Sequence, residues 1–187
     1  GDLHGSKLIE ALKEKDKKAQ IRCWGGDLMK KAGGELVKHF NELAFMGFWE
    51  VITNLEAIIR NIKFCKKNIL EFDPDVIIYI DYPGFNLRIS KWAKKQGFKN
   101  HFYISPQVWA WKENRVHQMK KNLDALYVIL PFEKEFFEIK HQFSVEFVGH
   151  PLLDRVMHSE KNSRFLIKNK ISNTKSIVAL LPGSRKQ

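Results

Sequence analysis

An acidic side chain at the end of an apolar run is the first group in this sequence that could do chemistry. Asp81 follows the β-branched run 76–80, which is typical of a strand buried on both faces of a parallel sheet, and Pro83-Gly84 then predicts a turn. A carboxylate in this place can serve as a general base, because ligands of open α/β sheets bind outside the carboxyl ends of strands. The same placement suits a turn or capping residue, so both interpretations stay open.

Aromatic, amide and imidazole groups follow other expected strands and would meet Asp81 at the same sheet edge. Trp109 and Trp111 are two residues apart, so in an extended segment they would face the same side. They could form a platform for a sugar or an acyl chain, although paired tryptophans can also be core residues. His150 lies between a glycine and a proline that fix the backbone around it, whereas His117 has no partner at a recognisable spacing and is interpreted as a surface histidine. The remaining members of the cluster are Asn86 and the segment 182–185.

The opening sequence GDLHG is a glycine-flanked helix start. Gly1, Asp2 and Gly5 could bring backbone N–H groups to a ligand at the helix N-terminus, but capping by Asp2 is the simpler interpretation. A helix start of this kind normally follows a strand, so we expect a strand to be missing before Gly1.

Composition favours a folded protein with an anionic partner. The 187 residues include 32 Lys or Arg and 21 Asp or Glu, which gives a formal net charge of +11. Residues 88–121 hold nine of the basic residues and a single acid, Glu113, so one face should be strongly basic. Nucleic acid, a phosphorylated substrate and an acidic membrane surface are the partners that such a charge attracts.

Several common chemistries lack their signatures here. The sequence has no GxGxxG, no Walker A loop and no GxSxG motif. Cys23 and Cys65 are far apart and form no CxxC or Cys/His spacing, so zinc is not expected and a reducing compartment fits. No apolar stretch approaches the about 20 residues that cross a bilayer, and no signal peptide opens the chain.

Strand and helix patterns alternate along the chain, which predicts an α/β fold with a parallel, doubly wound sheet. Residues 1–157 should form a Rossmann-like lobe whose first strand is missing, the polar segment 158–175 a linker, and residues 176–187 the start of a second, truncated lobe. The expected strands are 20–24, 76–80, 101–105, 125–130, 145–149 and 177–181. The expected helices between them are 28–32, 48–62, 87–96, 115–121 and 132–139.

The segment 48–62 has a helical apolar period over four turns, with basic residues on its flank. A helix packed on the sheet explains the period. Because Trp49 lies off the apolar stripe, beside Phe48 and Met46, the start of this helix is more apolar than packing requires, and the segment could rest in a membrane interface. The residues expected to contact lipid are Phe48, Trp49, Val51, Ile52 and Leu55.

Seven short motifs, in the same order and from end to end, resemble the lipid A disaccharide synthase family. SPQVWAW at 105–111 with FVGHP at 147–151 is a specific combination, and the others are GDLHG at 1–5, MG at 46–47 with EV at 50–51, DYPGFN at 81–86, LPFEK at 130–134 and LLPGSR at 180–185. Members of that family also have a strand and an A-G-E-x-S-like segment before the first motif, and a donor-binding lobe after the last. Both are absent from these 187 residues.

The resemblance implies a glycosyltransferase of the GT-B type, with two Rossmann-like lobes and the site between them. The implied reaction moves 2,3-diacylglucosamine from its UDP derivative to the 6′-hydroxyl of 2,3-diacylglucosamine 1-phosphate, with inversion and no covalent intermediate. Asp81 is then the expected base, and Arg185, with Ser184, the expected contact of the leaving diphosphate. The expected acceptor-binding residues are Asp2, Asn86, Gln107, Trp109, Trp111, Arg115 and His150.

The resemblance also implies the partners and the location. No metal and no cofactor are expected. The expected partners are the two acylated sugars and an anionic membrane surface, and not nucleic acid, and a homodimer of the complete protein is compatible with the resemblance. The expected place is peripheral, at the inner, cytoplasmic face of the cytoplasmic membrane of a Gram-negative-type bacterium. Because donor binding falls mainly to the second lobe, these 187 residues alone are expected to be inactive.

Two other functions stay open. Another GT-B enzyme, such as a UDP-N-acetylglucosamine transferase or epimerase, would share the lobes but has no use for the apolar residues 46–49. A basic nucleic-acid-binding module could use Trp109, Trp111 and the surrounding lysines as a stacking platform. Its basic residues should then follow one groove, whereas many here lie between apolar helical positions.

Overall fold

The computed structural model describes residues 1–42, 55–157 and 165–172, together with Val178 and Leu180. The chain divides into two compact units, Gly1–Pro151 and Leu152–Gln187. The predicted lobe, linker and second lobe, with boundaries at 157 and 175, stay predictions. The candidate site lies in the first unit.

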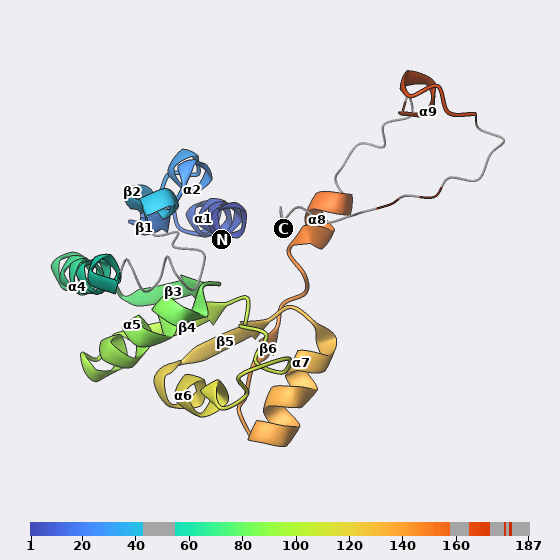
Figure 1. The fold of residues 1–187 in the computed structure, drawn as a ribbon. Helices are drawn as coiled ribbons and strands as arrows, with labels where there is room; N and C mark the ends of the chain where they lie inside the picture. Colours follow the sequence, from blue (N-terminus) through green and yellow to red (C-terminus); the bar gives the residue numbers. More distant parts are fainter. Residues whose placement is uncertain (43–54, 158–164, 173–177, 179, 181–187) are drawn as a thin grey trace. The chain divides into compact units, whose positions relative to one another are not determined.

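The strands of the first unit form two parallel sheets (Figure 1). The larger sheet has the order β3-β4-β5-β6, and its strands are Val76–Ile80, Lys99–Tyr103, Ala125–Val128 and Glu146–Phe147. The smaller sheet pairs β1, Arg22–Gly25, with β2, Glu35–His39. All of these pairs are parallel. The predicted α/β fold with parallel strands is confirmed, whereas the doubly wound order stays a prediction, because neighbours within each sheet follow one another along the chain.

Helices alternate with the strands, as parallel connections require. The larger sheet is connected by α5, Pro83–Lys95, by α6, Arg115–Asn122, and by α7, Pro131–Glu135, which continues as a π-helix, η2, over Phe136–Lys140. The other helices of the first unit are α1, Asp2–Lys15, α2, Asp27–Lys31, the 3-10 helix η1, Phe40–Glu42, and α4, Leu55–Phe72. The second unit contains α8, Leu152–Met157, and α9, Phe165–Lys168.

The boundaries of α5 follow from its sequence. Pro83 occupies the first helical turn, where its missing N–H is tolerated because that group would have no partner within the helix. Gly97 follows the last turn with a φ of 91°, a left-handed conformation that favours glycine after a helix. The chain then enters β4, which pairs with β3 from Val76 and Lys99 to Ile80 and Tyr103. The turn predicted at Pro83-Gly84 is therefore the entrance to α5.

The core of the first unit lies between the larger sheet and its helices. Phe102 in β4 and Leu126 and Val128 in β5 are almost fully buried, and they alternate with less buried positions along each strand. The helices and the π-helix contribute Ile89, Ala93, Val116, Met119 and Phe137, all at most 1% exposed. These contacts hold the strand ends in place.

The polar side chain of Asn100 is also buried in this core, and both its amide oxygen and its amide nitrogen have hydrogen-bond partners. Asn100 accepts a hydrogen bond of 2.8 Å from the Tyr79 hydroxyl, and its amide donates to the carbonyls of Ser90 and Asn122 at 3.1 and 3.0 Å. Its backbone N–H donates to the Asp124 carboxylate at 2.8 Å. Because each buried polar group has a partner, the network fixes β3, α5 and α6 around β4 instead of destabilising the core.

The structure departs from three expectations about the elements. The predicted burial of 76–80 on both faces is wrong, because Tyr79 is the only buried residue of β3 and Val76 is 36% exposed. The helix predicted over 48–62 is described from Leu55 and extends to Phe72, while residues 48–54 lie outside the described part. Within the predicted strand 177–181, Val178 and Leu180 are described and neither lies in a strand.

Candidate functional site

The parallel register brings the predicted site segments to one edge of the larger sheet. Ile80 of β3 pairs with Tyr103 of β4, which pairs with Tyr127 of β5. Val128 then pairs with Phe147 of β6. The segments that follow these strand ends are 81–86, 105–111, 130–134 and 148–151. They therefore share the carboxyl edge, where open α/β sheets bind their ligands.

The turn that carries Asp81 has an unusual backbone that Asn86 holds in place. Asp81 and the next residue, Tyr82, have φ values of 56° and 46°, in the left-handed region that non-glycine residues seldom adopt. The Asn86 side-chain amide donates to the Asp81 carbonyl at 2.6 Å and to the Ile80 carbonyl at 3.4 Å. Asp81 is exposed. Asn86 thus fixes the backbone of the turn, while the Asp81 carboxylate is exposed and can reach a ligand.

Asp2 has a structural task in this arrangement. Its Oδ1 accepts hydrogen bonds from the N–H groups of Gly26 at 2.9 Å and Met29 at 3.1 Å, and its Oδ2 accepts one from Leu28 at 3.1 Å. These donors belong to the start of α2, so Asp2 caps a neighbouring helix. Replacement of such a cap by alanine typically costs about 0.5–2 kcal/mol of stability. A role of Asp2 in acceptor binding stays a prediction.

His4, in the first turn of α1, is a residue of this edge that sequence reasoning missed. Burial lowers the pKa of His4 below 6.5, and the charge of His150 lowers it further, while Asp81 partly opposes them. The imidazole is therefore neutral near neutral pH and lies within electrostatic reach of both partners. The only signal in the sequence is a histidine inside GDLHG, a spacing that by itself indicates no chemistry.

The predicted tryptophan platform is wrong in its geometry, because residues 108–110 form a turn and not an extended segment. The turn is closed by hydrogen bonds from Val108 to the Pro106 carbonyl and from Ala110 to the Gln107 carbonyl, at 2.7 and 3.2 Å. Trp109 packs edge-on against Phe132, with ring centroids 4.9 Å apart. Gln107 is exposed.

Trp111 has different neighbours from Trp109. It is 58% exposed, and the Lys112 ammonium and the Arg115 guanidinium carbon lie 4.7 and 5.5 Å from its ring centroid. Both distances are in the cation–π range. Trp111, Lys112 and Arg115 therefore form an exposed aromatic surface with two positive charges, suited to a ligand that has both an apolar ring face and a phosphate.

The loop that carries Trp111 is anchored through Glu113, the single acid of residues 88–121. Glu113 Oε1 lies 2.8 Å from Lys140 Nζ and 3.0 Å from His141 Nε2. The Lys140 hydrogen bond is the largest cause that lowers the pKa of Glu113 below its usual value. The contact to His141 lacks good hydrogen-bond geometry, so we assign the anchoring mainly to Lys140.

The loops after β5 and β6 are fixed by backbone features. Glu133, 1% exposed, accepts hydrogen bonds from the N–H groups of Ile129 and Leu130 at 3.1 and 2.9 Å, which closes the turn at the start of α7. Gly149 has a φ of 77°, a conformation that any side chain would strain. His150 follows it directly. Both motifs thus fix the backbone beside the edge. The charge of His150 lowers the pKa of His4, so the two imidazoles lie within electrostatic reach of each other.

Comparison with known proteins matches the whole chain to one family. The sequence model of lipid-A-disaccharide synthetase matches residues 1–187. The chain belongs to this family. Its curated relatives include the lipid-A-disaccharide synthase of Trichlorobacter lovleyi, 40% identical over 186 residues, and that of Coxiella burnetii, 36% identical over 187 residues. Lipid-A-disaccharide synthase 1 of Legionella pneumophila is 39% identical over 191 residues.

The matches cover one part of the relatives. They include 100%, 100% and 99% of this chain but 48%, 50% and 48% of the Trichlorobacter, Coxiella and Legionella proteins. The chain therefore spans about half the length of the curated relatives it matches. The resemblance drawn from the seven motifs is confirmed at the level of the family.

Some predicted site residues of this family member lie outside the described residues. They are Ser184 and Arg185, expected at the donor, and Phe48, Trp49, Val51 and Ile52, expected at the membrane. Leu55 begins α4. Among the described residues, Asn86 contacts Asp81, and the charges of Asp81 and His150 act on His4. The Trp111 surface lies on the loop after the neighbouring strand.

The described ranges contain no metal-binding cluster, no reactive thiol and no membrane-spanning helix. Among residues 1–42, 55–157 and 165–172, no three His, Cys, Asp or Glu side chains gather in a way that could hold a metal ion. Burial raises the pKa of Cys23 to about 11 and that of Cys65 to about 12, so both thiols are protonated at neutral pH and are poor nucleophiles. None of the helices in these ranges has the length and apolar character needed to span a bilayer.

Proposed function

We propose that the protein to which this chain belongs transfers 2,3-diacylglucosamine from its UDP derivative to the 6′-hydroxyl of 2,3-diacylglucosamine 1-phosphate. The products are the β-linked lipid A disaccharide 1-phosphate and UDP. Membership of the lipid-A-disaccharide synthetase family supports the reaction class. The observation that carries the proposal is the exposed Asp81 carboxylate at the carboxyl edge of the parallel sheet, on a turn that Asn86 holds.

In this mechanism Asp81 accepts the proton of the acceptor 6′-hydroxyl. The oxygen then attacks the anomeric carbon of the donor as the bond to UDP breaks, so the configuration inverts in one displacement. The exposed carboxylate on a turn fixed by Asn86 supports this role, because a base must reach the hydroxyl in a defined geometry. Neutral His4, within electrostatic reach of Asp81, would help to orient the acceptor hydroxyls together with His150.

Charge at the sheet edge supports binding of the acceptor phosphate. Arg115 and Lys112 flank the exposed ring of Trp111, and a guanidinium binds phosphate through two parallel hydrogen bonds. We infer that the sugar packs on Trp111 while its 1-phosphate contacts these cations. Gln107 and Asp2 would complete the acceptor site, and Ser184 with Arg185 would contact the leaving diphosphate together with a second, donor-binding lobe of the GT-B type.

The acylated substrates imply work at a membrane surface. We propose that the complete protein binds peripherally to an anionic bilayer, with the segment that contains Phe48, Trp49, Val51, Ile52 and Leu55 as one contact. The net charge of +11 supports this, because anionic lipids attract basic surfaces. A homodimer of the complete protein is compatible with the proposal, and neither metal nor cofactor is part of it.

Replacement of the base tests the proposal. In the complete enzyme, Asp81→Asn keeps the size of the side chain but removes its basicity, so turnover should fall by roughly two to four orders of magnitude. The melting temperature should barely change, since Asp81 is exposed. Asp75→Asn, an exposed acid just before β3, is the matched control and should keep its activity. Near-native turnover of a normally folded Asp81→Asn enzyme would show that Asp81 is a turn residue only.

A further inference from the structure

A second surface of the first unit is formed by two facing helical stripes that the proposed reaction does not use. On α5, Arg88, Lys91, Trp92 and Lys95 are spaced at i, i+3, i+4 and i+7, which places them on one side of the helix. On α4, Ile59, Lys63, Lys66 and Leu70 are spaced at i, i+4, i+7 and i+11, again on one side. Each stripe mixes cations with apolar side chains.

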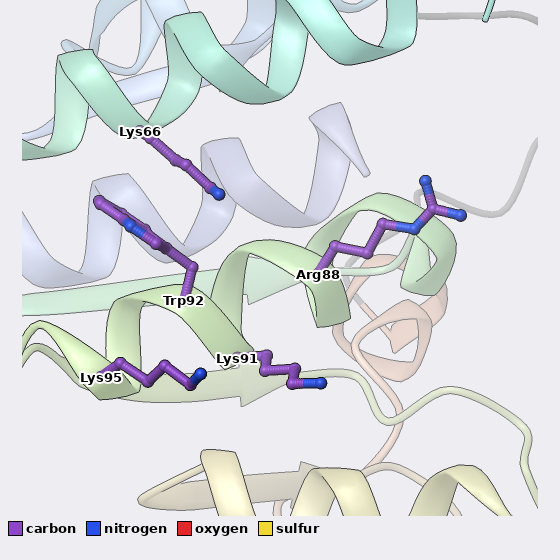
Figure 2. A pocket seen from close by; sticks show the side chains of 5 residues that line it. All are labelled: Lys66, Arg88, Lys91, Trp92 and Lys95. Atoms are coloured by element: carbon purple, nitrogen blue, oxygen red, sulfur yellow. The ribbon is translucent and has the colours of Figure 1, made fainter.

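The two stripes border an open hollow of about 270 Å³ (Figure 2). Its lining consists of Lys66 from α4 and of all four residues of the α5 stripe. Figure 2 shows Lys66 extending from α4 toward the Trp92 ring, and its ammonium lies 5.4 Å from the ring centroid. A second hollow, of about 510 Å³, shares Lys91 and Lys95 and continues to Lys121 on α6. The cationic surface therefore extends over three helices.

The charges of this surface are not balanced within the chain. Among the described residues, Lys66, Arg88, Lys91, Lys95 and Lys121 form no ion pair, and no acid lines either hollow. Lys94, on the same helix, contrasts with them because it pairs with Asp124. Cations held this close repel one another, and an anionic partner would relieve that repulsion.

The apolar members of the stripes indicate which anionic partner fits. Ile59 and Leu70 on α4 are 45% and 53% exposed, although they belong to the same stripe as two lysines. Nucleic acid would leave these aliphatic side chains without a partner. A bilayer interface accommodates both kinds of side chain, because lysine and arginine reach lipid phosphates while aliphatic groups and tryptophan enter the acyl boundary.

We propose that the face formed by the α4 and α5 stripes docks onto an anionic lipid bilayer. Lys63, Lys66, Arg88, Lys91 and Lys95 contact lipid phosphates, and Ile59 and Leu70 enter the interface. The proposal rests on the proposed function in one respect, since it specifies the surface by which an enzyme of acylated sugars would reach its substrates. The proposed surface adds α5 to the lipid contacts, whereas the contacts expected from the sequence all lie between residues 48 and 55.

Vesicle sedimentation with the complete protein tests this surface. The vesicles contain phosphatidylcholine with 30% phosphatidylglycerol, and the variant combines Arg88→Gln, Lys91→Gln and Lys95→Gln, all exposed positions. Because each cation near an anionic surface contributes about 1 kcal/mol, removal of three should reduce partitioning about a hundredfold. Lys15→Gln, Lys17→Gln and Lys18→Gln, exposed at the end of α1, form the control with the same loss of charge and should bind as the wild type does.

Two further arms separate the apolar and electrostatic parts of the docking. Ile59→Gln with Leu70→Gln should also weaken binding, while all proteins should bind pure phosphatidylcholine poorly. Equal binding by the α5 variant and the wild type, or an equal loss in the α1 control, would overturn the proposal. So would displacement of vesicle-bound protein by a 20-base-pair duplex at physiological salt, which would identify nucleic acid as the partner.

The outcome can be told apart from a failure of the proposed function. Turnover with substrates dispersed in detergent reports on the transferase chemistry without a bilayer. A protein that binds anionic vesicles through the two stripes but never forms disaccharide would refute the proposed function and keep the docking surface. An active protein whose α5 variant binds vesicles normally would keep the proposed function and refute the docking surface.

Discussion

The side-chain amide of Asn86 donates a hydrogen bond of 2.6 Å to the backbone carbonyl of Asp81. It bridges the end of β3 and the first turn of α5, and so spans the two consecutive left-handed residues of the turn. Such backbone conformations cost free energy and persist only where the surroundings determine them. Asn86 is therefore the residue that orients the proposed base without touching the proton that it accepts.

Asn86→Ala should lower turnover more than stability. Loss of the hydrogen bond should cost about 1 kcal/mol of unfolding free energy, whereas a displaced Asp81 should reduce kcat about tenfold to hundredfold. Thermal melting and steady-state kinetics of the complete enzyme measure the two effects. Asn114→Ala, at an exposed position before α6, is the control. An Asn86→Ala enzyme with native kcat would show that the turn orients itself without this bond.

Glu113→Gln should loosen the loop that carries Trp111. The lowered pKa of Glu113 means that its pairing stabilises the fold above its usual pKa of 4.5 and that this stability is lost as the pH falls through the lowered value. The wild type should therefore lose more stability than the variant as the pH falls below 4.5. Chemical unfolding at a series of pH values measures the difference.

The control for this acid dependence is Glu135→Gln, an exposed acid on α7. It should keep the acid dependence of the wild type. At neutral pH, hydrogen exchange of the Arg115 and Val116 amides should be faster in Glu113→Gln, because both amides bond to carbonyls of the anchored turn. Parallel curves for the wild type and Glu113→Gln would place the anchor elsewhere.

The sequence predicts the alternation of strands and helices well because each element carries a local signal. The run 76–80 gives β3 at its observed bounds, whereas α5 begins at Pro83, earlier than the predicted start at 87. β2 is missed, since Glu35 to His39 mixes charged and apolar residues and its burial is only partial. Strand pairing decides such a segment, and pairing is not a local property.

The candidate site likewise contains residues that local motifs predict and residues that only the tertiary structure brings into place. The Asp81 turn and the loops at Gln107 and Gly149 are visible as motifs, so their place at the sheet edge can be predicted. His4 cannot be found from its spacing, because its interactions with Asp81 and His150 depend on how α1 lies in the first unit. The extended conformation assumed for the two tryptophans is wrong, because a turn closed by two backbone hydrogen bonds replaces it.

Titration of His4 should report on its two charged neighbours in opposite directions. Asp81→Asn removes the charge that raises the pKa of His4, so this pKa should fall further. His150→Gln removes a charge that lowers it, so the pKa should rise toward 6.5. Proton NMR of the imidazole in each variant measures both shifts, and His117→Gln, whose ring contacts His141, serves as the control.

The same shift predicts how stability depends on pH. Because the pKa of His4 is lower in the folded state, the unfolded chain takes up a proton first, and stability falls as the pH drops below 6.5 toward the folded value. His4→Gln should remove this contribution. Shifts of the His4 pKa in the same direction in Asp81→Asn and His150→Gln would contradict the proposed arrangement.

Trp111 and Trp109 should respond differently to replacement, because one faces solvent and the other packs on Phe132. Trp111→Ala removes an exposed ring, so unfolding free energy should change by less than about 0.5 kcal/mol. Loss of the sugar-packing surface beside Lys112 and Arg115 should raise KM for the acceptor about tenfold with a smaller effect on kcat. Steady-state kinetics with varied acceptor measure this split.

Trp109→Ala is the structural counterpart of that variant. It removes an edge-to-face contact with Phe132 at 4.9 Å, so it should destabilise the protein by about 1–2 kcal/mol and lower the melting temperature. Arg115→Gln should raise KM for the phosphorylated acceptor as Trp111→Ala does, but leave KM for an acceptor without the phosphate unchanged. If Trp111→Ala instead lowers stability as much as Trp109→Ala and leaves KM at its native value, Trp111 is a packing residue. The acceptor would then have to bind elsewhere along the sheet edge.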